Sequence, residues 1–463
     1  MEGQSQKRGV EISEAKRGKS EQYSEGSTLC VIHRTSGEEQ TINSHSCLME
    51  FLVSKDNMEE AYRRVTRNKG APGVDGLTTD KLLDHLHKCW NDIKKHLLEG
   101  SYQPQAVKRV EIPKPNGGVR KLGIPTVVDR LIQQAIHQTI IRLFEPNFSD
   151  FSYGFRPGRQ ASMAVNQAKK YIREGRRWMI DMDLEKFFDK VNHDILMERV
   201  RQKVSDTRVL TLIRKYLRSG IMEGGIITTN EEGTPQGGPL SPLLSNIILD
   251  DLDKELERRG HKFCRYADDC NIYVNSEKAG YRVFESITKF IERKLQLKVN
   301  RDKSGVDRPW RRKFLGFSFT SLKNTTIRVH EKSRKSLRDK IKSLCRVGRG
   351  MNMEIFIQKK LNPIIRGWAN YFRKADTTRF ASELDKYVRR RLLIILWRQW
   401  GTARTRYRKL AIGGIPLNKC FMMSCSNKGP YRMSSFTNFA KAYSWNYFYQ
   451  KGLISIFHIV KNG

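Results

Sequence analysis

Two short runs with strand-like alternation flank a pair of acids in the segment Lys262-Phe263-Cys264-Arg265-Tyr266-Ala267-Asp268-Asp269-Cys270-Asn271-Ile272-Tyr273-Val274. The spacing predicts a β-hairpin with strands over residues 262–265 and 270–274 and the carboxylates of Asp268 and Asp269 at its tip. After the acids, apolar residues occupy every second position, which predicts a strand with one buried face. Acids in turns are often ordinary solvated residues, so the pair alone is weak evidence for a site. Two adjacent carboxylates also suit a divalent cation, and other parts of the chain favour that interpretation.

A second acidic cluster lies upstream in Trp178-Met179-Ile180-Asp181-Met182-Asp183-Leu184-Glu185-Lys186-Phe187-Phe188-Asp189. Alternation places Asp181 and Asp183 on one face of a predicted strand, which passes into a helix starting near Leu184. Carboxylates at a strand end and at a hairpin tip can converge on one site. Phosphoryl transfer through two Mg²⁺ ions about 3.5–4 Å apart needs carboxylates from different segments, because no single turn can wrap both octahedral ions. Together the two clusters predict a two-metal site.

The two acidic clusters and the glycine-rich loop between them resemble three motifs of the reverse transcriptases, most closely those encoded by group II introns. The order and the separation of the motifs agree with that family, and the resemblance covers roughly residues 50–460. It rests on Asp183-Leu184-Glu185-Lys186-Phe187-Phe188-Asp189, Gly233-Thr234-Pro235-Gln236-Gly237-Gly238-Pro239-Leu240-Ser241-Pro242 and Tyr266-Ala267-Asp268-Asp269. Further matching segments are Ile112-Pro113-Lys114-Pro115-Asn116-Gly117-Gly118-Val119-Arg120, Gly123-Ile124-Pro125, Tyr153-Gly154-Phe155-Arg156-Pro157-Gly158 and Phe314-Leu315-Gly316-Phe317.

The pattern along the chain indicates several structural units. Residues 1–46 are rich in charged and small residues, which predicts a flexible leader. Strand-like and helical pieces alternate over about residues 104–325, as in an α+β domain, and the pattern beyond is helical and basic. The resemblance implies a right-hand polymerase: fingers and palm with an antiparallel sheet, an α-helical thumb and a basic C-terminal domain. The expected units are 47–325 for fingers and palm with an N-terminal extension, 326–400 for the thumb or maturase (X) domain and 401–463 for the DNA-binding (D) domain.

The resemblance also assigns the catalytic acids. It makes Asp183, Asp268 and Asp269 the metal ligands, for two Mg²⁺ ions with Mn²⁺ as an alternative ion. Asp183 and Asp268 are expected to bind directly, whereas the second acid of the hairpin can act more through its field. Asp181 shares the face of Asp183 and is the competing ligand by position alone.

A further set of residues matches nucleotide-binding positions of reverse transcriptases. Lys114 and Arg120 would grip the triphosphate, or else remain solvated charges on a surface hairpin. The ring of Phe188 would lie under the sugar and collide with a 2′-hydroxyl, although Phe187 and Phe188 could also be core residues. Lys303 would protonate pyrophosphate or simply contact a phosphate. The nucleotide-binding residues implied by the resemblance are Lys114, Arg120, Phe188, Gln236, Gly237 and Lys303.

The loop that contains Gln236 and Gly237 is expected to lie along the nascent base pair, where glycine permits a close backbone approach. A helix is predicted to start at Ser241-Pro242 and to end at Gly260, because proline is common in a first turn. Its acids are expected to form a solvated face. These acids are Asp250, Asp251 and Asp253. His193 is expected to start another helix and not to act as a general base.

Composition limits the class of partner. The formal net charge is +37 with a sequence pI near 10.0, which predicts a polyanionic partner, namely nucleic acid. The eight cysteines show neither a disulfide framework nor zinc-site spacing, as expected for reduced thiols in a cytoplasmic protein. No apolar run approaches the length of a bilayer span, and the first residues lack a signal core.

The resemblance implies several partners: the parent intron RNA, an RNA template, a DNA or RNA primer, target DNA and dNTPs. The chain ends without a Cys/His-rich nuclease module, so it resembles the endonuclease-less (IIC-like) class. The expected function is RNA-directed DNA synthesis combined with maturase activity in splicing and mobility. Two alternatives stay open, a reverse transcriptase domesticated for host defence or repair and a polymerase-inactive RNA-binding splicing factor. An RNA-dependent RNA polymerase is a third, which Phe188 disfavours.

Overall fold

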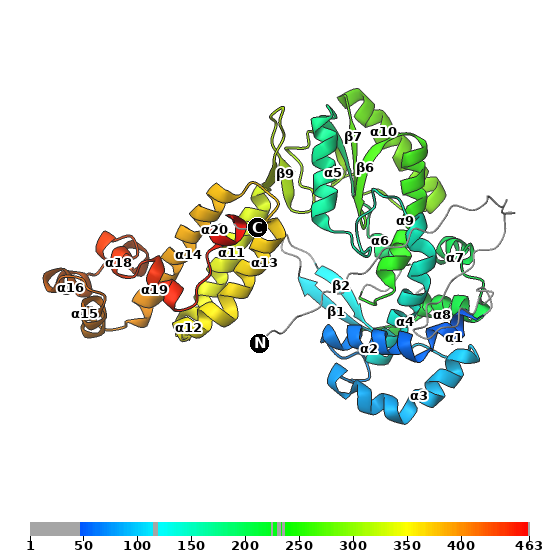
Figure 1. Cartoon of the computed structure of the whole chain (residues 1–463), viewed down its shortest axis with the longest axis horizontal. Coiled ribbons are helices and arrows are strands. Elements are labelled where there is room, and N and C mark those ends of the chain that lie inside the picture. The colour runs from blue at the N-terminus through cyan, green and yellow to red at the C-terminus, as the bar shows by residue number, and fades with distance from the viewer. Residues whose placement is uncertain (1–46, 114–118, 224–225, 229–232, 234–236, 462–463) are drawn as a thin grey trace, which may run out of the picture.

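The computed structural model describes residues 47–113, 119–223, 226–228, 233 and 237–461 (Figure 1). The predicted leader, Lys114 and Gln236 lie outside the described residues. Figure 1 shows two lobes, one built around sheets and one made of helices, which meet near β9 (Phe317–Phe319).

The N-terminal helices pack on a long buried helix, α4 (Val127–Phe144). The predicted loop around residues 68–76 separates the second of these helices from the third. Their bounds are α1 Leu48–Leu52, α2 Lys55–Arg67, η1 Thr79–Lys81 and α3 Leu82–Leu98. Short helices follow α4 on the same side of the molecule, namely η2 Glu145–Asn147, α7 His193–Arg201 and α8 Thr207–Arg218. His193 therefore starts a helix, as predicted.

A four-stranded sheet with the order β2-β1-β4-β5 forms the first part of the fingers. Its strands are β1 Val107–Pro113, β2 Val119–Ile124, β4 Ile221–Glu223 and β5 Ile226–Thr228. β1 and β2 pair antiparallel up to Pro113 opposite Val119, and most of their residues toward that end are exposed. β1 and β4 pair in parallel. The ribbon of β1 and β2 therefore presents its side chains outward.

The palm is an antiparallel sheet with the order β6-β7-β3-β8. Its strands are β3 Trp178–Met182, β6 Lys262–Tyr266, β7 Asp269–Val274 and β8 Gly305–Asp307. Apolar residues of one face, such as Ile180 and Ile272, share a core with α9 (Ser241–Arg258) and α10 (Glu277–Phe290). The opposite face packs on α5 (Ala161–Arg173), so helices flank the sheet on both sides (Figure 1).

The prediction of one exposed face for the second hairpin strand was wrong. Asn271 is fully buried and Tyr273 is 2% exposed. Both lie on the side of the sheet that packs against α5 and against Phe314 and Phe317, which come later in the chain. The alternation of apolar and polar residues separated the two faces of the strand correctly. It could not show that segments distant in the sequence cover the face that carries Asn271 and Tyr273.

The helix expected near Leu184 begins three residues later, as α6 (Phe187–Lys190). Leu184 instead forms an isolated antiparallel bridge with Val299, which extends the strand direction beyond β3. Lys186 then adopts a left-handed conformation with φ 46°, which no α-helix can include. The predicted start was therefore wrong.

The prediction of a solvated acidic face on α9 was also wrong. Asp253 is 0% exposed and pairs with Arg265 of β6, and Asp250 is 8% exposed. Asp251 is partly buried and pairs with Arg199 of α7. The helix itself runs from Ser241 with proline in its first turn, as predicted.

The helical lobe contains one hydrophobic core that runs from Leu337 to Val460. Its larger helices are α11 Glu331–Val347, α13 Asn362–Phe372 and α14 Thr378–Gln399, with η4 Gly348–Gly350, α12 Met353–Ile355 and η5 Phe356–Leu361 between them. Six shorter helices follow: α15 Ala403–Ile412, α16 Leu417–Ser424, α17 Pro430–Met433, α18 Thr437–Ala442, α19 Trp445–Gln450 and α20 Ile456–Lys461. The last helix returns to pack on α13 and α14 (Figure 1).

The remaining elements connect the two lobes. They are η3 Ile291–Leu295 after α10 and the antiparallel pair β9 and β10 (Ile327–Val329). Within the described ranges, no helix combines the length and the apolar character needed to cross a membrane.

Candidate active site

The predicted hairpin is confirmed in the structure. β6 and β7 pair antiparallel, and the last pair is Tyr266 opposite Asp269. Ala267 and Asp268 therefore form a two-residue turn. Ala267 has φ 59°, a left-handed conformation that costs a residue other than glycine about 1 kcal/mol or more. The turn must be held by its surroundings, and it carries both predicted acids at its tip.

The first acidic cluster ends at the same edge of the palm sheet. Met182 of β3 lies opposite Cys270 of β7 in the antiparallel register. Asp183, which follows Met182, and Asp269, which precedes Cys270, therefore lie at the same end of the two strands. The register thus brings together acids that are 86 positions apart in the sequence, next to Asp268 in the turn.

Electrostatics show that these carboxylates interact. The pKa of Asp269 is well above its usual value because of burial, and the neighbouring acids Asp181, Asp268 and Asp183 raise it further. Burial likewise raises the pKa of Asp181 to about 6, although the guanidinium of Arg312 opposes that shift. Crowded negative charge of this kind favours the binding of a cation.

The carboxylates fit a divalent ion that also takes ligands from substrate. In the part of the chain that the structure describes, no three His, Cys, Asp or Glu side chains form a group that could hold a metal ion alone. Mg²⁺ in phosphoryl-transfer sites is usually held by one or two carboxylates, while waters and substrate phosphates complete its shell. Asp183, Asp268 and Asp269 supply carboxylates, the ligand type that such an ion prefers, at one end of the palm sheet.

The segment after β3 is fixed by the loop that carries Lys303. The backbone N–H of Asp183 donates to Ser304 Oγ at 2.9 Å, and its carbonyl accepts from Asn300 N at 2.9 Å. Lys303 Nζ lies 3.7 Å from Asp183 Oδ1, with the lysine side chain 64% exposed. The predicted lysine is thus beside a predicted metal ligand.

Arg312 is a residue of this region that sequence reasoning missed. One of its terminal nitrogens lies 3.7 Å from Asp181 Oδ2 and donates to the carbonyl of Lys303 at 3.1 Å. Its Nε lies 3.8 Å from Asp307 Oδ2. Arg312 therefore links the competing acid Asp181 to the loop that carries Lys303. No local pattern marks it, because its partners come from three separate segments.

The predicted nucleotide-binding residues lie on separate elements. Arg120 is exposed on β2, opposite Ile112 of β1. Phe188 is half-buried on α6, with its ring edge-on to the ring of Phe187 at 5.2 Å between centroids. Phe187 is 2% exposed and is therefore the core residue of the two. Lys114 and Gln236 are outside the described residues.

Gly237 makes a close backbone approach to the fingers strand β2, whereas the approach to a nascent base pair stays a prediction. Its φ is 128°, and a Cβ there would lie 2.1 Å from the carbonyl oxygen of Gly123. Near the start of the same loop, a ring nitrogen of the buried His193 lies 2.6 Å from the carbonyl oxygen of Gly233. These contacts attach Gly237 to the fingers and Gly233 to α7.

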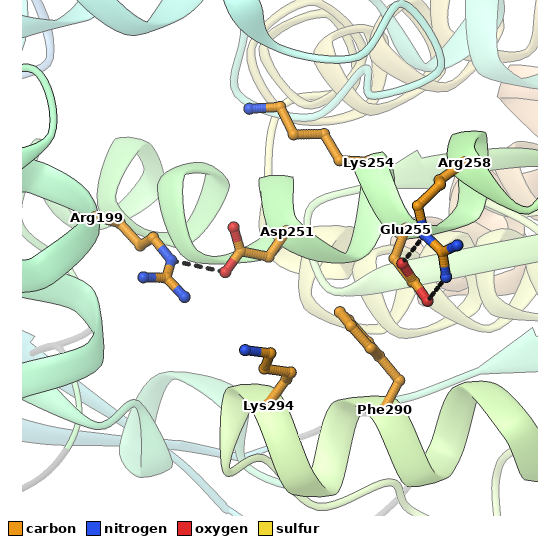
Figure 2. Close-up of a pocket in the computed structure, with 7 residues that line it drawn as sticks. All are labelled: Arg199, Asp251, Lys254, Glu255, Arg258, Phe290 and Lys294. Atoms are coloured by element: carbon orange, nitrogen blue, oxygen red, sulfur yellow. Dashed lines mark hydrogen bonds and ion pairs between the residues drawn. The ribbon is translucent and has the colours of Figure 1, made fainter.

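A shallow cavity of about 310 Å³ lies elsewhere, between α7, α9, α10 and η3 (Figure 2). It is lined by Arg199, Asp251, Lys254, Glu255, Arg258, Phe290 and Lys294. Two ion pairs cross its wall, Arg199 with Asp251 and Arg258 with Glu255, each at 2.7 Å. None of the predicted site residues lines this cavity, so the candidate site is the carboxylate edge of the palm.

Comparisons with known proteins agree with this geometry. Residues 112–319 match the family model described as "Reverse transcriptase (RNA-dependent DNA polymerase)", and residues 334–411 match "Group II intron, maturase-specific domain". The first match contains both acidic clusters. The second lies within the helical lobe.

Curated relatives are similar over about half of this chain. Protein YkfC of Escherichia coli is 34% identical over 299 residues, which are 56% of this chain and 78% of YkfC. The group II intron-encoded protein LtrA of Lactococcus lactis is 35% identical over 241 residues, which are 51% of this chain and 40% of LtrA. A putative COX1/OXI3 intron 2 protein of Saccharomyces cerevisiae is 31% identical over 48% of this chain and 25% of its own length. A chain of a partial Cas6-RT-Cas1–Cas2 complex is similar at 24% identity over 54% of this chain and 43% of its own, with a TM-score of 0.34.

The α+β fold and the matched polymerase model define the class of enzyme as an RNA-directed DNA polymerase. The chain belongs to the group II intron reverse transcriptase and maturase family. The predicted fold class and family are thereby confirmed. Reverse transcriptases as a class use divalent metal ions and nucleic-acid substrates.

Proposed function

We propose that the chain copies an RNA template into DNA by nucleotidyl transfer at a centre of two Mg²⁺ ions held by Asp183, Asp268 and Asp269. The observation that carries this proposal is the register of β3 with β7, which puts Asp183 beside Asp269 at the tip of the hairpin. Burial and the repulsion among these acids support a cation there. When bound, the ions would lower the pKa of the primer 3′-hydroxyl and stabilise charge on the triphosphate.

The residues of the chain hold and orient the reactants. Asp183 is fixed through its backbone by Ser304, so its carboxylate stays at the end of β3. The exposed ammonium of Lys303 is close enough to serve a phosphate group, either as a contact or as the donor of a proton to the leaving pyrophosphate. Arg120, together with Lys114, would bind the triphosphate from the fingers ribbon.

Two further roles follow for the nucleotide site. Phe188 would exclude a 2′-hydroxyl from the sugar position, and its half-buried ring is supported by the core residue Phe187. Gly237, with Gln236, would line the nascent base pair, and its contact with Gly123 would fix that loop against the fingers. The enzyme would therefore prefer dNTPs to ribonucleotides.

The helical lobe would bind nucleic acid outside the catalytic centre. Residues 401–463 contain ten Lys and Arg and neither Asp nor Glu. Such a surface suits the phosphates of folded RNA and of duplex DNA, whose binding then falls steeply with salt. We assign fingers and palm to residues 47–325, the thumb and the contacts with intron RNA to 326–400, and the contacts with target DNA to 401–463. The RNA template and a DNA or RNA primer would reach the palm from the side of the helical lobe.

Primer extension on an RNA template tests the proposal. The purified protein is given a DNA primer, dNTPs and Mg²⁺, and RNA binding is measured in parallel by filter retention. Asp268→Asn should lower the extension rate about a thousandfold while leaving RNA affinity within about twofold, because only chemistry uses this carboxylate. The control Asp251→Asn, in the separate cavity of Figure 2, should keep the rate of the unmodified protein. Extension by Asp268→Asn at an unchanged rate would refute the proposal.

A further inference from the structure

The residue before Tyr266-Ala267-Asp268-Asp269 is a fully buried arginine. Arg265 of β6 is 0% exposed, and it faces Asp253 of α9, which is also 0% exposed. Arg265 Nε donates to Asp253 Oδ1 at 2.7 Å and Nη2 donates to Asp253 Oδ2 at 2.5 Å. Taking two charges out of water is costly, and such pairs are often no better for stability than apolar residues of the same volume. The ion pair of Arg265 with Asp253 is therefore not explained by stability alone.

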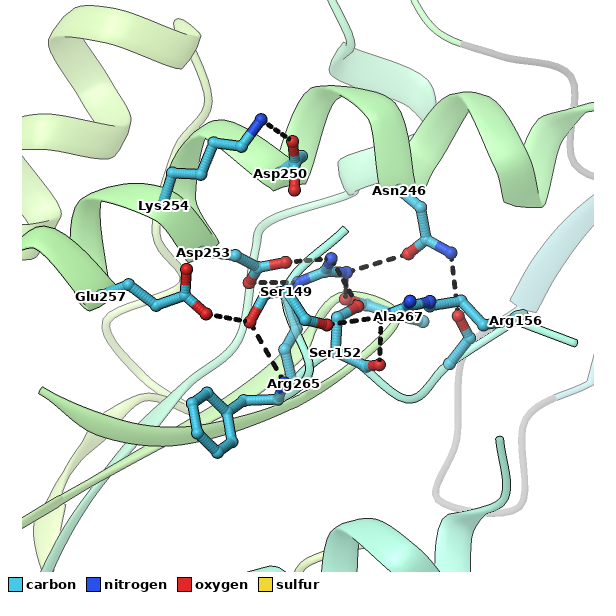
Figure 3. A network of polar contacts seen from close by, with 12 residues as sticks. Ser149, Ser152, Arg156, Asn246, Asp250, Asp253, Lys254, Glu257, Arg265 and Ala267 are labelled. Carbon is cyan, nitrogen blue, oxygen red and sulfur yellow. Dashed lines mark hydrogen bonds and ion pairs between the residues drawn. The ribbon is translucent and has the colours of Figure 1, made fainter. Parts of the chain in front are cut away.

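The other N–H groups of Arg265 reach three different segments (Figure 3). Nη1 donates to the carbonyl of Ala267 at 2.9 Å and to Asn246 Oδ1 at 3.0 Å. Nη2 also donates to Ser152 Oγ at 2.8 Å. An arginine has five N–H donors, and each of the five has one acceptor here. A lysine, with three donors on a single nitrogen, cannot reproduce this fork.

The contact with Ala267 is the one that bears on the site. Ala267 is the residue with the left-handed conformation, and its carbonyl group leads directly into Asp268. Gly154 also packs against this turn, so closely that a Cβ there would lie 2.3 Å from Ala267 N. Asn246 donates to the carbonyl of Gly154 at 2.8 Å. Ala267 is thus contacted at its N–H side by Gly154 and at its carbonyl by the guanidinium of Arg265.

The backbone of Arg265 is tied to the same region. Its N–H donates to the carbonyl of Phe151 at 2.9 Å, and its carbonyl accepts from Tyr153 N at 2.9 Å. Strand β6 is therefore attached at Arg265 to the segment that carries Ser152 and Gly154. Side chain and backbone of one residue fix both the strand and the turn at its end.

We propose that Arg265 is a positioning residue for the catalytic hairpin. Its hydrogen bond to the Ala267 carbonyl sets the orientation of the Asp268 and Asp269 carboxylates. Asp253 is the buried counterion that neutralises the charge of the arginine. The proposal rests on the proposed function in one respect, that these two carboxylates bind the metal ions. Arg265 and Asp253 are both fully buried, so they would act through the hairpin and not on substrate or metal directly.

Two variants separate positioning from stability. Arg265→Lys keeps the charge opposite Asp253 but cannot also reach the Ala267 carbonyl. The double variant Arg265→Met/Asp253→Leu removes both charges together, so that neither is left buried alone. Both should retain the thermal midpoint and the RNA affinity of the unmodified protein closely enough for comparison. The double variant keeps the test decisive if the lysine variant does not fold.

Two readouts are taken on each variant. The first is the binding of Mn²⁺ to the protein without substrate, followed by electron paramagnetic resonance. The second is the kcat and KM for dNTP in primer extension. We expect Mn²⁺ affinity and kcat to fall about tenfold or more in both variants, with a smaller change in KM, because supports of metal ligands typically act at this scale.

The control is a second ion pair on the same helix α9. Arg199→Met/Asp251→Leu removes the pair whose nitrogen and oxygen lie 2.7 Å apart in the cavity of Figure 2, a pair that joins α9 to α7 and not to β6. It should leave Mn²⁺ affinity and kcat within about twofold. Unchanged Mn²⁺ affinity in folded Arg265→Lys and in the folded double variant would overturn the positioning role. If the unmodified protein failed to extend primers, the proposed function would fail, while Mn²⁺ affinity would still decide the role of Arg265.

Discussion

The backbone of Gly154 lies directly against the backbone of Ala267, at the turn that carries the predicted metal ligands. A Cβ on Gly154 would meet Ala267 N at 2.3 Å and the carbonyl carbon of Tyr266 at 2.9 Å. Both neighbours are main-chain atoms, so neither can move aside as a side chain does. The position of the hairpin therefore depends on a glycine that is more than a hundred residues away in the sequence.

Gly154→Ala is expected to displace the turn. The added methyl group should cost about 1–3 kcal/mol of stability and lower the rate of primer extension about tenfold or more, with RNA affinity retained. The matched control is Gly350→Ala, since a Cβ at Gly350 meets nothing within 4 Å. Stability is read from urea unfolding and the rate from single-turnover extension. A Gly154→Ala protein with unaltered rate would show that the turn does not need this contact.

Phe188→Ala is expected to relax sugar discrimination. Removing the ring should lower the preference for dNTPs over rNTPs about tenfold or more, since the 2′-hydroxyl then has space. Phe144→Leu is the control, because Phe144 is a core residue of α4, 5% exposed, and its truncation should reduce stability without changing the sugar preference. The measurement is the ratio of kcat/KM for dCTP and CTP. Equal ratios in Phe188→Ala and the unmodified protein would remove the assignment.

His137 of α4 should make stability depend on pH. Burial lowers its pKa from 6.5 to about 4, with a further contribution from Arg64. Below pH 6.5 the unfolded chain takes up a proton that the folded protein does not bind until about pH 4, so stability falls as the pH drops through this window. The loss should reach about 1–3 kcal/mol, and His137→Gln should abolish it. The free energy of unfolding is measured in urea at several pH values, with a change at the exposed His87, His87→Gln, as the control. If this free energy had the same pH dependence in His137→Gln as in the control, the assignment to His137 would be contradicted.

Asp385 of α14 should hold the last helix in place. Its carboxylate accepts from Ser455 Oγ at 2.7 Å and from the backbone N–H groups of Ile456 and Phe457 at 3.0 and 3.2 Å. Asp385→Ala should cost about 1–2 kcal/mol, as the loss of an N-cap does, and should speed hydrogen exchange in α20. Ser455→Ala should cost less, because the carboxylate keeps its two backbone donors. Unchanged exchange in α20 would show that packing alone anchors this helix.

Much of the candidate site could be predicted from the sequence, because the patterns that mark it are local. Period-two alternation located β3 and β7, and the acids at their ends needed only an antiparallel register to meet. The contacts that hold these acids in place could not be predicted from the sequence. Asp253 looked like one of three acids on an exposed helix face, since its partner Arg265 belongs to another element. Ser304 and Arg312 act through backbone and ion-pair contacts with distant segments, for which a single sequence has no periodic signal.

A double-mutant cycle on Asp183 and Asp268 tests the central claim most directly. Single-turnover primer extension with Mg²⁺ is measured for Asp183→Asn, for Asp268→Asn and for the protein that carries both changes. If the two carboxylates serve one metal centre, each single change should lower the rate about a thousandfold and the double variant should be no slower than the slower single variant. Rate losses that multiply in the double variant, or a single variant that extends primers at an undiminished rate, would contradict a shared centre.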